Sequence, residues 1–424
     1  MKNKETYETF DIDERIIDLQ TKVENEIKAE IKKIEDVALF NQAKVLKAFI
    51  NNKVSQMHLG KTTGYGYSDV GREVIEEIYK EIFRAEDALV RIGFVNGTHT
   101  IATALRANLN SGDTLLAITG RPYDTLCEVI GIVENDLSLI NNGVKYEEIP
   151  LDENGNIKTC EVCEFLKNNK AKMIHIQRSK GYELRKSITI NDIENIIKEI
   201  RKINNEVIIM VDNCYGEFVE KREPIEVGAD IVCGSLIKNI GGGLCEIGGY
   251  IVGKHKCIEN ASEFLTCPGI GKECGATLGQ NRNILQGLFL APSVVKNAMK
   301  SSIFASLLFE KMGYTVNPKY NDFRSDIVQA IVFNNEKDLV SFIQSIQKMS
   351  PIDSGVTPLP WDMPGYTDKV IMAAGTFVEG ASIELSADSP IRAPYAAYAQ
   401  GGLTYESAKL AYMYAASKII RGEN

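Results

Sequence analysis

The sequence lacks a hydrophobic segment long enough to cross a membrane. None of its apolar runs reaches the ~20 residues that a helix needs to span a bilayer. The N-terminal stretch MKNKETYETFDIDERIID also lacks the apolar core of a signal peptide. These absences predict a cytoplasmic protein with no membrane partner.

Basic residues are outnumbered by acidic ones. Lys and Arg total 48 against 57 Asp and Glu, which gives a formal net charge of -9 at pH 7. This charge disfavours binding to phosphate backbones through bulk electrostatics, so we predict no nucleic-acid partner. The rest of the composition, 44% hydrophobic and 25% charged, is typical of a globular chain.

The nine cysteines lack the spacing of a disulfide framework, and their number is odd. Reduced thiols are therefore expected. Cys160 and Cys163 form one CxxC, but no second CxxC or His pair at metal-ligand spacing accompanies it. We predict no metal site, although a non-enzymatic metal-stress protein that binds metal through this CxxC is a weak alternative.

A chain of 424 residues is long enough for two or three structural units. In the first, residues 1–60, the apolar positions Val23, Ile27, Ile31 and Ile34 follow at steps of 4, 4 and 3. This spacing predicts one amphipathic helix. The unit is either an arm that packs on a partner subunit or a first layer over the core.

Residues 61–297 alternate strand-like and helical segments. The strand-like runs ALVRIGFV, DTLLAIT, MIHIQ, EVIIMVDN and ADIVCGS are separated by helical stretches. This alternation predicts βαβ units and a mainly parallel sheet, hence an α/β fold. Residues 298–424 predict a smaller α+β domain, with strands at DIVQAIVF, VIMAA and ASIEL and a final helix at YESAKLAYMYAASKII.

The most informative stretch is VDNCYGEFVEKREPIEVGADIVCGSLIKNIGGGL. Asp212 stands at the end of one strand run, and Lys238 follows a second run that ends near Cys233. Ligands gather beyond the carboxyl ends of parallel strands, so both side chains can reach one crevice. The joint pattern, with Ser235 three residues before the lysine, resembles the fold-type I pyridoxal-phosphate (PLP) enzymes, in particular the cystathionine and methionine lyase family.

The chemistry of PLP requires such a pair. An aldehyde cofactor needs an amine to form a Schiff base, and a carboxylate keeps the pyridine nitrogen protonated so that the ring accepts carbanion electrons. The resemblance assigns these roles to Lys238 and Asp212.

In VNGTHTIATAL, Gly97 and Thr98 lead into a helix whose free N–H groups favour an anion.

That turn matches the phosphate-binding turn of the family, with Ser235 as a further donor and His99 lining the site. Tyr123, in GRPYDTL, matches a tyrosine that stacks on the cofactor and assists proton transfer. It would protonate a departing sulfur if nearby cations such as Arg178 depress its pKa. In GYGYSDVGRE, Tyr67 matches the tyrosine by which one subunit reaches its neighbour's phosphate.

Three positions vary from the family pattern or extend it. Asp69 stands where the family usually has an arginine, which leaves Tyr65 and Arg72 as further candidates for phosphate contact. Arg178, in QRSKGY, has either a surface role or a contact with the phosphate or a substrate carboxylate. Arg392, in SADSPIRAPY, matches the arginine that holds the substrate α-carboxylate through two parallel hydrogen bonds.

Taken whole, the chain is similar to a divergent branch named methionine gamma-lyase family or aluminium resistance proteins. The resemblance implies a homotetramer and PLP-dependent elimination at a carbon–sulfur bond of an L-amino acid. Cysteine, cystathionine, homocysteine and methionine remain open as substrates, as do β- and γ-elimination. A transaminase, decarboxylase or aldolase acting on another amino acid is the alternative.

Overall fold

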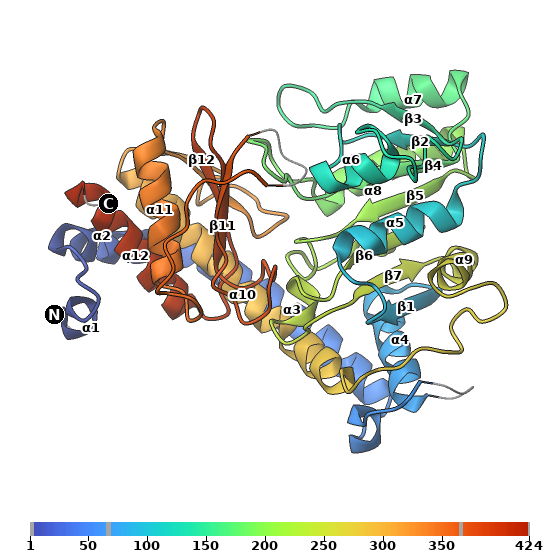
Figure 1. The fold of residues 1–424 in the computed structure, drawn as a ribbon, viewed down its shortest axis with the longest axis horizontal. Helices are drawn as coiled ribbons and strands as arrows, with labels where there is room; N and C mark the ends of the chain where they lie inside the picture. The colour runs from blue at the N-terminus through green and yellow to red at the C-terminus, as the bar shows by residue number, and fades with distance from the viewer. Residues whose placement is uncertain (1–3, 65–68, 364–367, 423–424) are drawn as a thin grey trace.

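The computed structural model describes residues 4–64, 69–363 and 368–422. It has two lobes, each built on its own β-sheet, and long helices run from one lobe to the other (Figure 1). Both ends of the chain lie at the same end of the molecule, beyond the smaller lobe (Figure 1).

The large sheet has the strand order β1-β7-β6-β5-β4-β2-β3 within the described residues. Its strands are β1 (Asp87–Arg91), β2 (Thr114–Ala117), β3 (Lys145–Glu148), β4 (Met173–Gln177), β5 (Ile208–Asp212), β6 (Ile231–Ser235) and β7 (Gly249–Gly253). The run from β6 to β3 pairs in parallel, while β7 is antiparallel to both its neighbours. The predicted α/β fold with a mainly parallel sheet is confirmed.

Helices cover both faces of this sheet, which is why its central strands are apolar on both sides. One face packs on α4 (Val70–Phe83), α7 (Thr159–Asn168) and α8 (Ile190–Ile203). The other face packs on α5 (Gly97–Asn108), α6 (Asp124–Ile130) and α9 (His255–Leu265). Short 3-10 helices lie at η1 (Gln56–Leu59), η2 (Pro224–Val227) and η3 (Asn239–Gly241).

The small sheet is antiparallel, in the order β10-β11-β12-β9-β8. Its strands are β8 (Thr315–Asn317), β9 (Gln329–Val332), β10 (Val370–Ala373), β11 (Ser386–Pro390) and β12 (Ala396–Gln400), backed by α11 (Glu336–Lys348) and α12 (Tyr405–Arg421).

The strand predicted at ASIEL is wrong, because residues 381–385 form a loop and the strand β11 begins directly after them, at Ser386. The Glu384 carboxylate holds this loop by accepting hydrogen bonds from the N–H groups of Phe377 and Val378.

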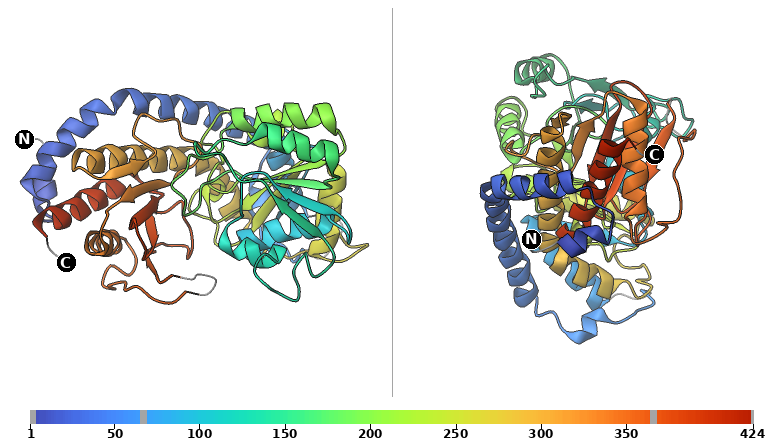
Figure 2. Two further views of the ribbon diagram at one scale, coloured as in Figure 1. Left: turned by 90° about the horizontal axis from the view of Figure 1, so that it is seen from above. Right: turned by 90° about the vertical axis from the view of Figure 1, so that its left-hand side faces the viewer.

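The N-terminal residues form α1 (Lys4–Glu8), α2 (Glu14–Glu26) and α3 (Lys28–Asn51). The helix predicted as continuous through Ile27 is broken there, because α2 follows the small-lobe core while α3 turns along α10 (Asn281–Lys311) (Figure 2). Val23 and Ile27 are buried in the small-lobe core, and Val45 in the large-lobe core. These helices therefore form a layer over the chain's own core.

The helix α10 links the two cores. Its residues up to Met299 pack in the large-lobe core, and those from Ile303 onward pack in the small-lobe core. The predicted boundary between 297 and 298 falls in this continuous helix and stays a prediction. In the residues that the structure describes, no helix is long and apolar enough to cross a membrane.

Candidate active site

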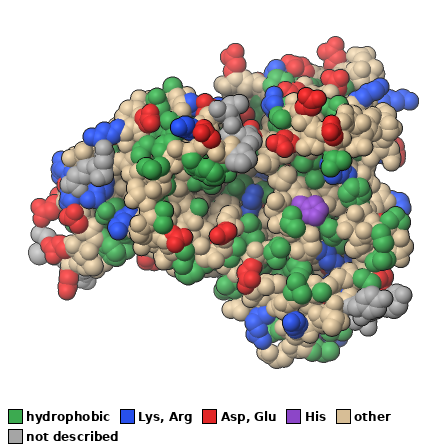
Figure 3. Space-filling model, in the orientation of Figure 1, with side chains coloured by type: hydrophobic (Ala, Val, Ile, Leu, Met, Phe, Trp, Pro, Cys, Tyr) green, Lys and Arg blue, Asp and Glu red, His purple; other side chains and the backbone are tan. Residues whose placement is uncertain are grey.

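A cavity of about 580 Å³ opens where the carboxyl ends of the large-sheet strands face the small sheet. The space-filling view shows the molecule hollowed between its two lobes (Figure 3). Loops after β2, β4, β5 and β6, together with the start of α5, supply the large-lobe wall. This is the edge at which ligands of parallel sheets bind.

The structure brings Asp212 and Lys238 to this one cavity. Asp212 ends β5, and its Oδ1 accepts a hydrogen bond of 3.0 Å from the Cys214 N–H. Lys238 follows β6, and its Nζ lies 4.1 Å from the centroid of the Tyr215 ring. Burial lowers the pKa of Lys238, but Cys214, Tyr215 and Asp212 raise it by more, so that pKa lies well above its ordinary value.

One end of the cavity is suited to an anion. Gly97 begins α5, and a Cβ placed there would lie 3.3 Å from the Ser235 Cβ, so the helix N-terminus and Ser235 approach closely. The Ser235 hydroxyl is fully buried and has no hydrogen-bond partner among the residues that the structure describes. The Asn96 Oδ1 already accepts the His99 N–H of α5 at 2.8 Å. A buried hydroxyl beside the N-terminus of this helix still offers a donor, together with the helix dipole, to a phosphate.

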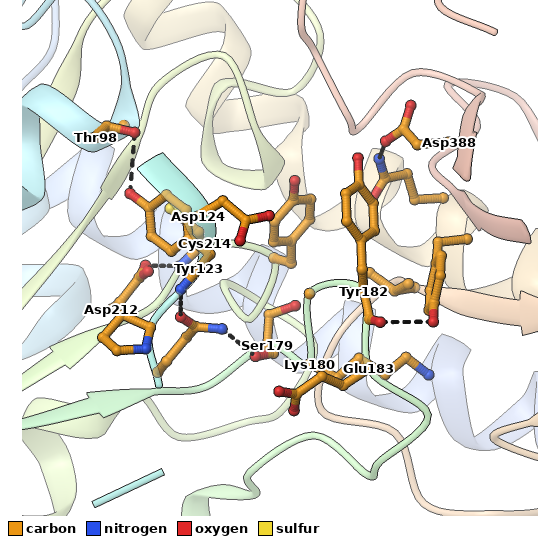
Figure 4. Close-up of a pocket in the computed structure, with 18 of the residues that line it drawn as sticks. Thr98, Tyr123, Asp124, Ser179, Lys180, Tyr182, Glu183, Asp212, Cys214 and Asp388 are labelled. Atoms are coloured by element: carbon orange, nitrogen blue, oxygen red, sulfur yellow. Dashed lines mark hydrogen bonds between the residues drawn. The ribbon is translucent and has the colours of Figure 1, made fainter. Parts of the chain in front are cut away.

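Tyr123 lies between these two features (Figure 4). Its hydroxyl donates to Thr98 Oγ1 at 3.1 Å, and its N–H donates to Gln177 Oε1 at 3.0 Å. Burial, and then the charge of Asp212, raise the pKa of the Tyr123 phenol far above its usual range. The hydrogen bond with Thr98 and the Lys238 charge act in the opposite direction without outweighing these causes, and Arg178 does not contribute. The net depression by cations that a proton donor was expected to need is not found, and the phenol keeps its proton at neutral pH.

Arg178 does not lie in the cavity wall. Its side chain is fully buried, and NH1 donates to Asn213 Oδ1 and to the Gly216 carbonyl at 2.8 and 2.9 Å. NH2 pairs with Glu220 at 2.7 Å. Neither a surface role nor contact with a ligand fits this placement. A buried guanidinium with these partners holds the loop after β5 in position.

Other predicted residues also lie elsewhere. The His99 ring is edge-on to Phe94 and accepts the Val95 N–H at 3.2 Å, and the residue does not line the cavity. Arg72 donates to backbone carbonyls at Gly64, Glu273 and Gly275 instead of reaching the cavity. Tyr65 and Tyr67 lie outside the described residues.

Arg392 is at the cavity rim on the small lobe. Its side chain is 56% exposed and pairs with Asp368 Oδ2 at 2.9 Å. A half-exposed guanidinium held by one weak surface pair can exchange that partner for another carboxylate. The predicted contact with a substrate carboxylate stays a prediction.

Sequence reasoning missed the acidic residue on the small-lobe wall. Asp388 lies on β11 and is only 9% exposed, and burial raises its pKa to about 7. Tyr182 and Gln400 lie beside it. The sequence feature that could have indicated it is an aspartate within the short strand segment SADSP. The sequence does not show, however, which face of that strand lines the cavity.

His175 was also missed. It lies on β4, two residues before the cavity residue Gln177 and on the same face of the strand. Both ring nitrogens are buried without a hydrogen-bond partner in residues 4–64, 69–363 and 368–422. Burial lowers its pKa, and the nearby Asp212 charge acts in the opposite direction. A neutral imidazole therefore lies within the range of the Asp212 charge.

The CxxC cysteines are distant from these residues in the fold. Cys160 and Cys163 lie on α7, beside the edge strands of the large sheet, and both are free thiols. Across the described part of the chain, no group of three or more metal-ligating side chains is found.

Comparison with known families identifies one match to almost the whole chain. The methionine gamma-lyase family profile matches residues 16–420. The uncharacterized protein YnbB of Bacillus subtilis is 48% identical over 410 residues, which cover 95% of this chain and 97% of that protein.

Solved structures give the same result. A protein from Clostridium novyi NT named carbon-sulfur lyase involved in aluminum resistance is 46% identical, with a TM-score of 0.95 and 99% of each chain covered. One from Clostridium acetobutylicum, provisionally named a cystathionine beta-lyase involved in aluminum resistance, is 49% identical, with a TM-score of 0.96 and the same coverage. The methionine gamma lyase CalE6 of Micromonospora echinospora, 14% identical with a TM-score of 0.57, shares the fold over 85% of this chain and 93% of that one.

Proposed function

Because this chain belongs to the methionine gamma-lyase family, we propose that it is a PLP-dependent carbon–sulfur lyase acting on a sulfur-containing L-amino acid. The observation that carries the proposal is the convergence of Lys238, Asp212 and Ser235 on one cavity. These residues come from two neighbouring strand ends, and each has the chemistry that one part of PLP requires.

The residues present fit the cofactor. Lys238 supplies a half-buried primary amine for the aldehyde, and the buried Asp212 supplies a carboxylate for the pyridinium N–H. The unpartnered Ser235 hydroxyl and the start of α5 at Gly97 supply donors for the phosphate. When bound, PLP supplies an electron sink for the negative charge that develops at the substrate Cα.

The chain's own residues would orient the substrate and move protons. Arg392 at the rim binds the α-carboxylate, which fixes the Cα–H bond relative to the cavity. Once the incoming substrate amine has displaced it from the aldehyde, Lys238 would act in its neutral amine form and accept the proton from Cα, and for γ-elimination also from Cβ. The Tyr123 phenol, which keeps its proton at neutral pH, donates it to the departing sulfur.

We also propose that the chain forms a homotetramer. Four apolar side chains on α3 are exposed in the single chain, namely Leu39, Phe40, Leu46 and Ile50. Leu39, Leu46 and Ile50 are spaced by 7 and 4 residues and so share one face of the helix. An exposed apolar face supports association with a second copy. A fully active monomer in sedimentation experiments would contradict this.

The test of the cofactor and reaction is direct. The purified protein should show visible absorption, and borohydride should attach the cofactor covalently to the peptide that contains Lys238. Lys238→Ala should abolish both signals. Incubation of the PLP-loaded protein with sulfur amino acids should release keto acid and thiol in equal amounts. Keto acid without thiol would favour a transaminase, and a Lys238→Ala protein that keeps the covalent adduct would refute the assignment.

A further inference from the structure

We infer that Asp388 forms a recognition site for the distal end of the substrate side chain, and that it selects side chains ending in a primary ammonium group. The inference rests on the proposed function, because it concerns the substrate of the same cavity. It deepens that proposal by naming the substrate class, which is amino acids whose side chain ends in an ammonium group. Methionine, whose side chain ends in a methyl group, does not belong to this class.

The strand β11 directs Asp388 into the cavity. Side chains alternate along a strand, and Ala387 packs in the small-lobe core against α11. Asp388 therefore faces the opposite side, where it lines the cavity. Its register partners are Met372 on β10 and Tyr398 on β12.

Asp388 lies across the cavity from the proposed cofactor residues. Figure 4 shows Thr98, Tyr123 and Asp212 on one side and Asp388 on the other, beside Tyr182. A substrate held at Lys238 would extend its side chain into the space between these two walls. The wall that the side chain meets, not the cofactor wall, determines which side chain is accepted.

The Asp388 carboxyl has no cationic partner among the described residues. Its contacts are a long hydrogen bond of 3.4 Å from Gln400 Nε2 and one from Tyr182. In the described part of the chain it forms no ion pair, although four basic residues line the same cavity. Arg392 pairs with Asp368, Lys180 donates to Asn317 and Lys238 lies over Tyr215.

The fourth basic residue is also engaged elsewhere. Arg121 hydrogen-bonds to Cys127, and its charge lies near Asp124 and Glu148. Asp388 is therefore a buried carboxyl in a cavity whose cations have other partners. An ionised carboxylate is costly to bury without a cation, and an ammonium within hydrogen-bond distance removes that cost.

Lys180 and Asp388 both line the cavity, and both change charge near neutrality. Burial lowers the pKa of Lys180 to about 8, and its ammonium donates to Asn317 and not to Asp388. Burial raises the pKa of Asp388 to about 7, and the Tyr182 hydrogen bond opposes this shift.

Beside Asp388, Met372 on β10 and Gln400 on β12 carry no charge. Burial raises the pKa of Tyr398 to about 12, so that phenol is neutral as well. Above pH 7 the free carboxyl is ionised and able to bind an ammonium.

A pair of isosteric substrates tests the inference. S-(2-aminoethyl)-L-cysteine and S-propyl-L-cysteine have the same number of heavy atoms and differ in a terminal ammonium or methyl group. With the PLP-loaded protein at pH 8, we expect the kcat/KM for thiol release to be at least about tenfold higher for the aminoethyl compound than for the propyl compound. A hydrogen bond between charged groups contributes enough free energy for this difference. Asp388→Asn should reduce the ratio to near unity and leave the propyl compound within about threefold.

Asp124→Asn is the matched control. It removes one carboxylate from the other wall of the cavity, near Arg392 and Arg121. Because both compounds carry the same α-carboxylate, the tenfold ratio should stay unchanged. Equal kcat/KM values for the two compounds in the unmodified protein would overturn the inference. Equal losses for both compounds in Asp388→Asn would also overturn it, because they would indicate a general acid or a structural role.

Binding without turnover separates this inference from the proposed reaction. L-ornithine and L-norleucine are isosteric and contain no sulfur leaving group. Calorimetric titration of the PLP-loaded protein should show about tenfold tighter binding of ornithine, with the difference lost in Asp388→Asn or Asp388→Ser. Ornithine preference without thiol release would refute the lyase and retain the ammonium site. Equal binding of ornithine and norleucine would refute the site whatever the reaction.

Discussion

Ser235→Ala should have opposite effects on the cofactor-free and cofactor-bound protein. The Ser235 Oγ is buried and has no hydrogen-bond partner in the described part of the chain. Its removal from the cofactor-free protein breaks no bond. A buried polar group without a partner costs about 1–3 kcal/mol, so the free energy of unfolding should stay the same or rise by up to about 1 kcal/mol.

The cofactor-bound protein should lose affinity. A hydrogen bond from Ser235 to a charged phosphate is worth about 1.5–3 kcal/mol, which corresponds to an increase of about 10- to 100-fold in the dissociation constant of PLP. Absorbance titration of the cofactor-free protein with PLP measures this change. Urea unfolding of the same samples measures stability.

Ser325→Ala is the matched control. The Ser325 hydroxyl is also buried and unpartnered, but the residue does not line the cavity. Its removal should have the same small effect on unfolding and none on PLP affinity. An unchanged PLP dissociation constant in Ser235→Ala would show that the hydroxyl does not bind the phosphate. A loss of stability in the cofactor-free protein would show a structural role instead.

Three further outcomes are expected. Asp212→Asn should retain the PLP absorption band but lower the rate of keto acid release by about 10- to 1000-fold. The reason is that an adjacent carboxylate raises the pKa of the pyridine nitrogen by about 1–3 units. An unchanged rate would show that another group keeps this nitrogen protonated. Arg178→Met should lower the free energy of unfolding, measured in urea, by about 3–5 kcal/mol, because the carboxylates of Glu220 and Glu223 lose their cation. Unchanged stability together with a raised KM would instead indicate that Arg178 binds a ligand. The preference for S-(2-aminoethyl)-L-cysteine should fall as the pH drops through about 7, because Asp388 becomes protonated, and a flat ratio between pH 5.5 and 8.5 would contradict that titration.

The order of strands and helices in the large lobe could be predicted from the sequence. The apolar runs MIHIQ and EVIIMVDN are short and buried on both faces, and the helix Ile190–Ile203 buries five isoleucines at helical spacing. Such patterns depend on local periodicity, which the chain carries in itself. The antiparallel strand β7 was not predicted, because strand direction depends on pairing with distant segments.

The sequence by itself determined that Asp212 ends one strand and that Lys238 follows the end of the neighbouring strand. Position along a strand follows from local sequence, and parallel strands place their carboxyl ends at one edge of the sheet. Only the tertiary structure decided which polar side chains face that edge. Arg178 follows a strand on the same edge, yet it turns into a buried network with Asn213 and Glu220, whereas Asp388 reaches the cavity from the other lobe. The partners that decide these orientations lie tens to hundreds of residues away, so no local pattern contains them.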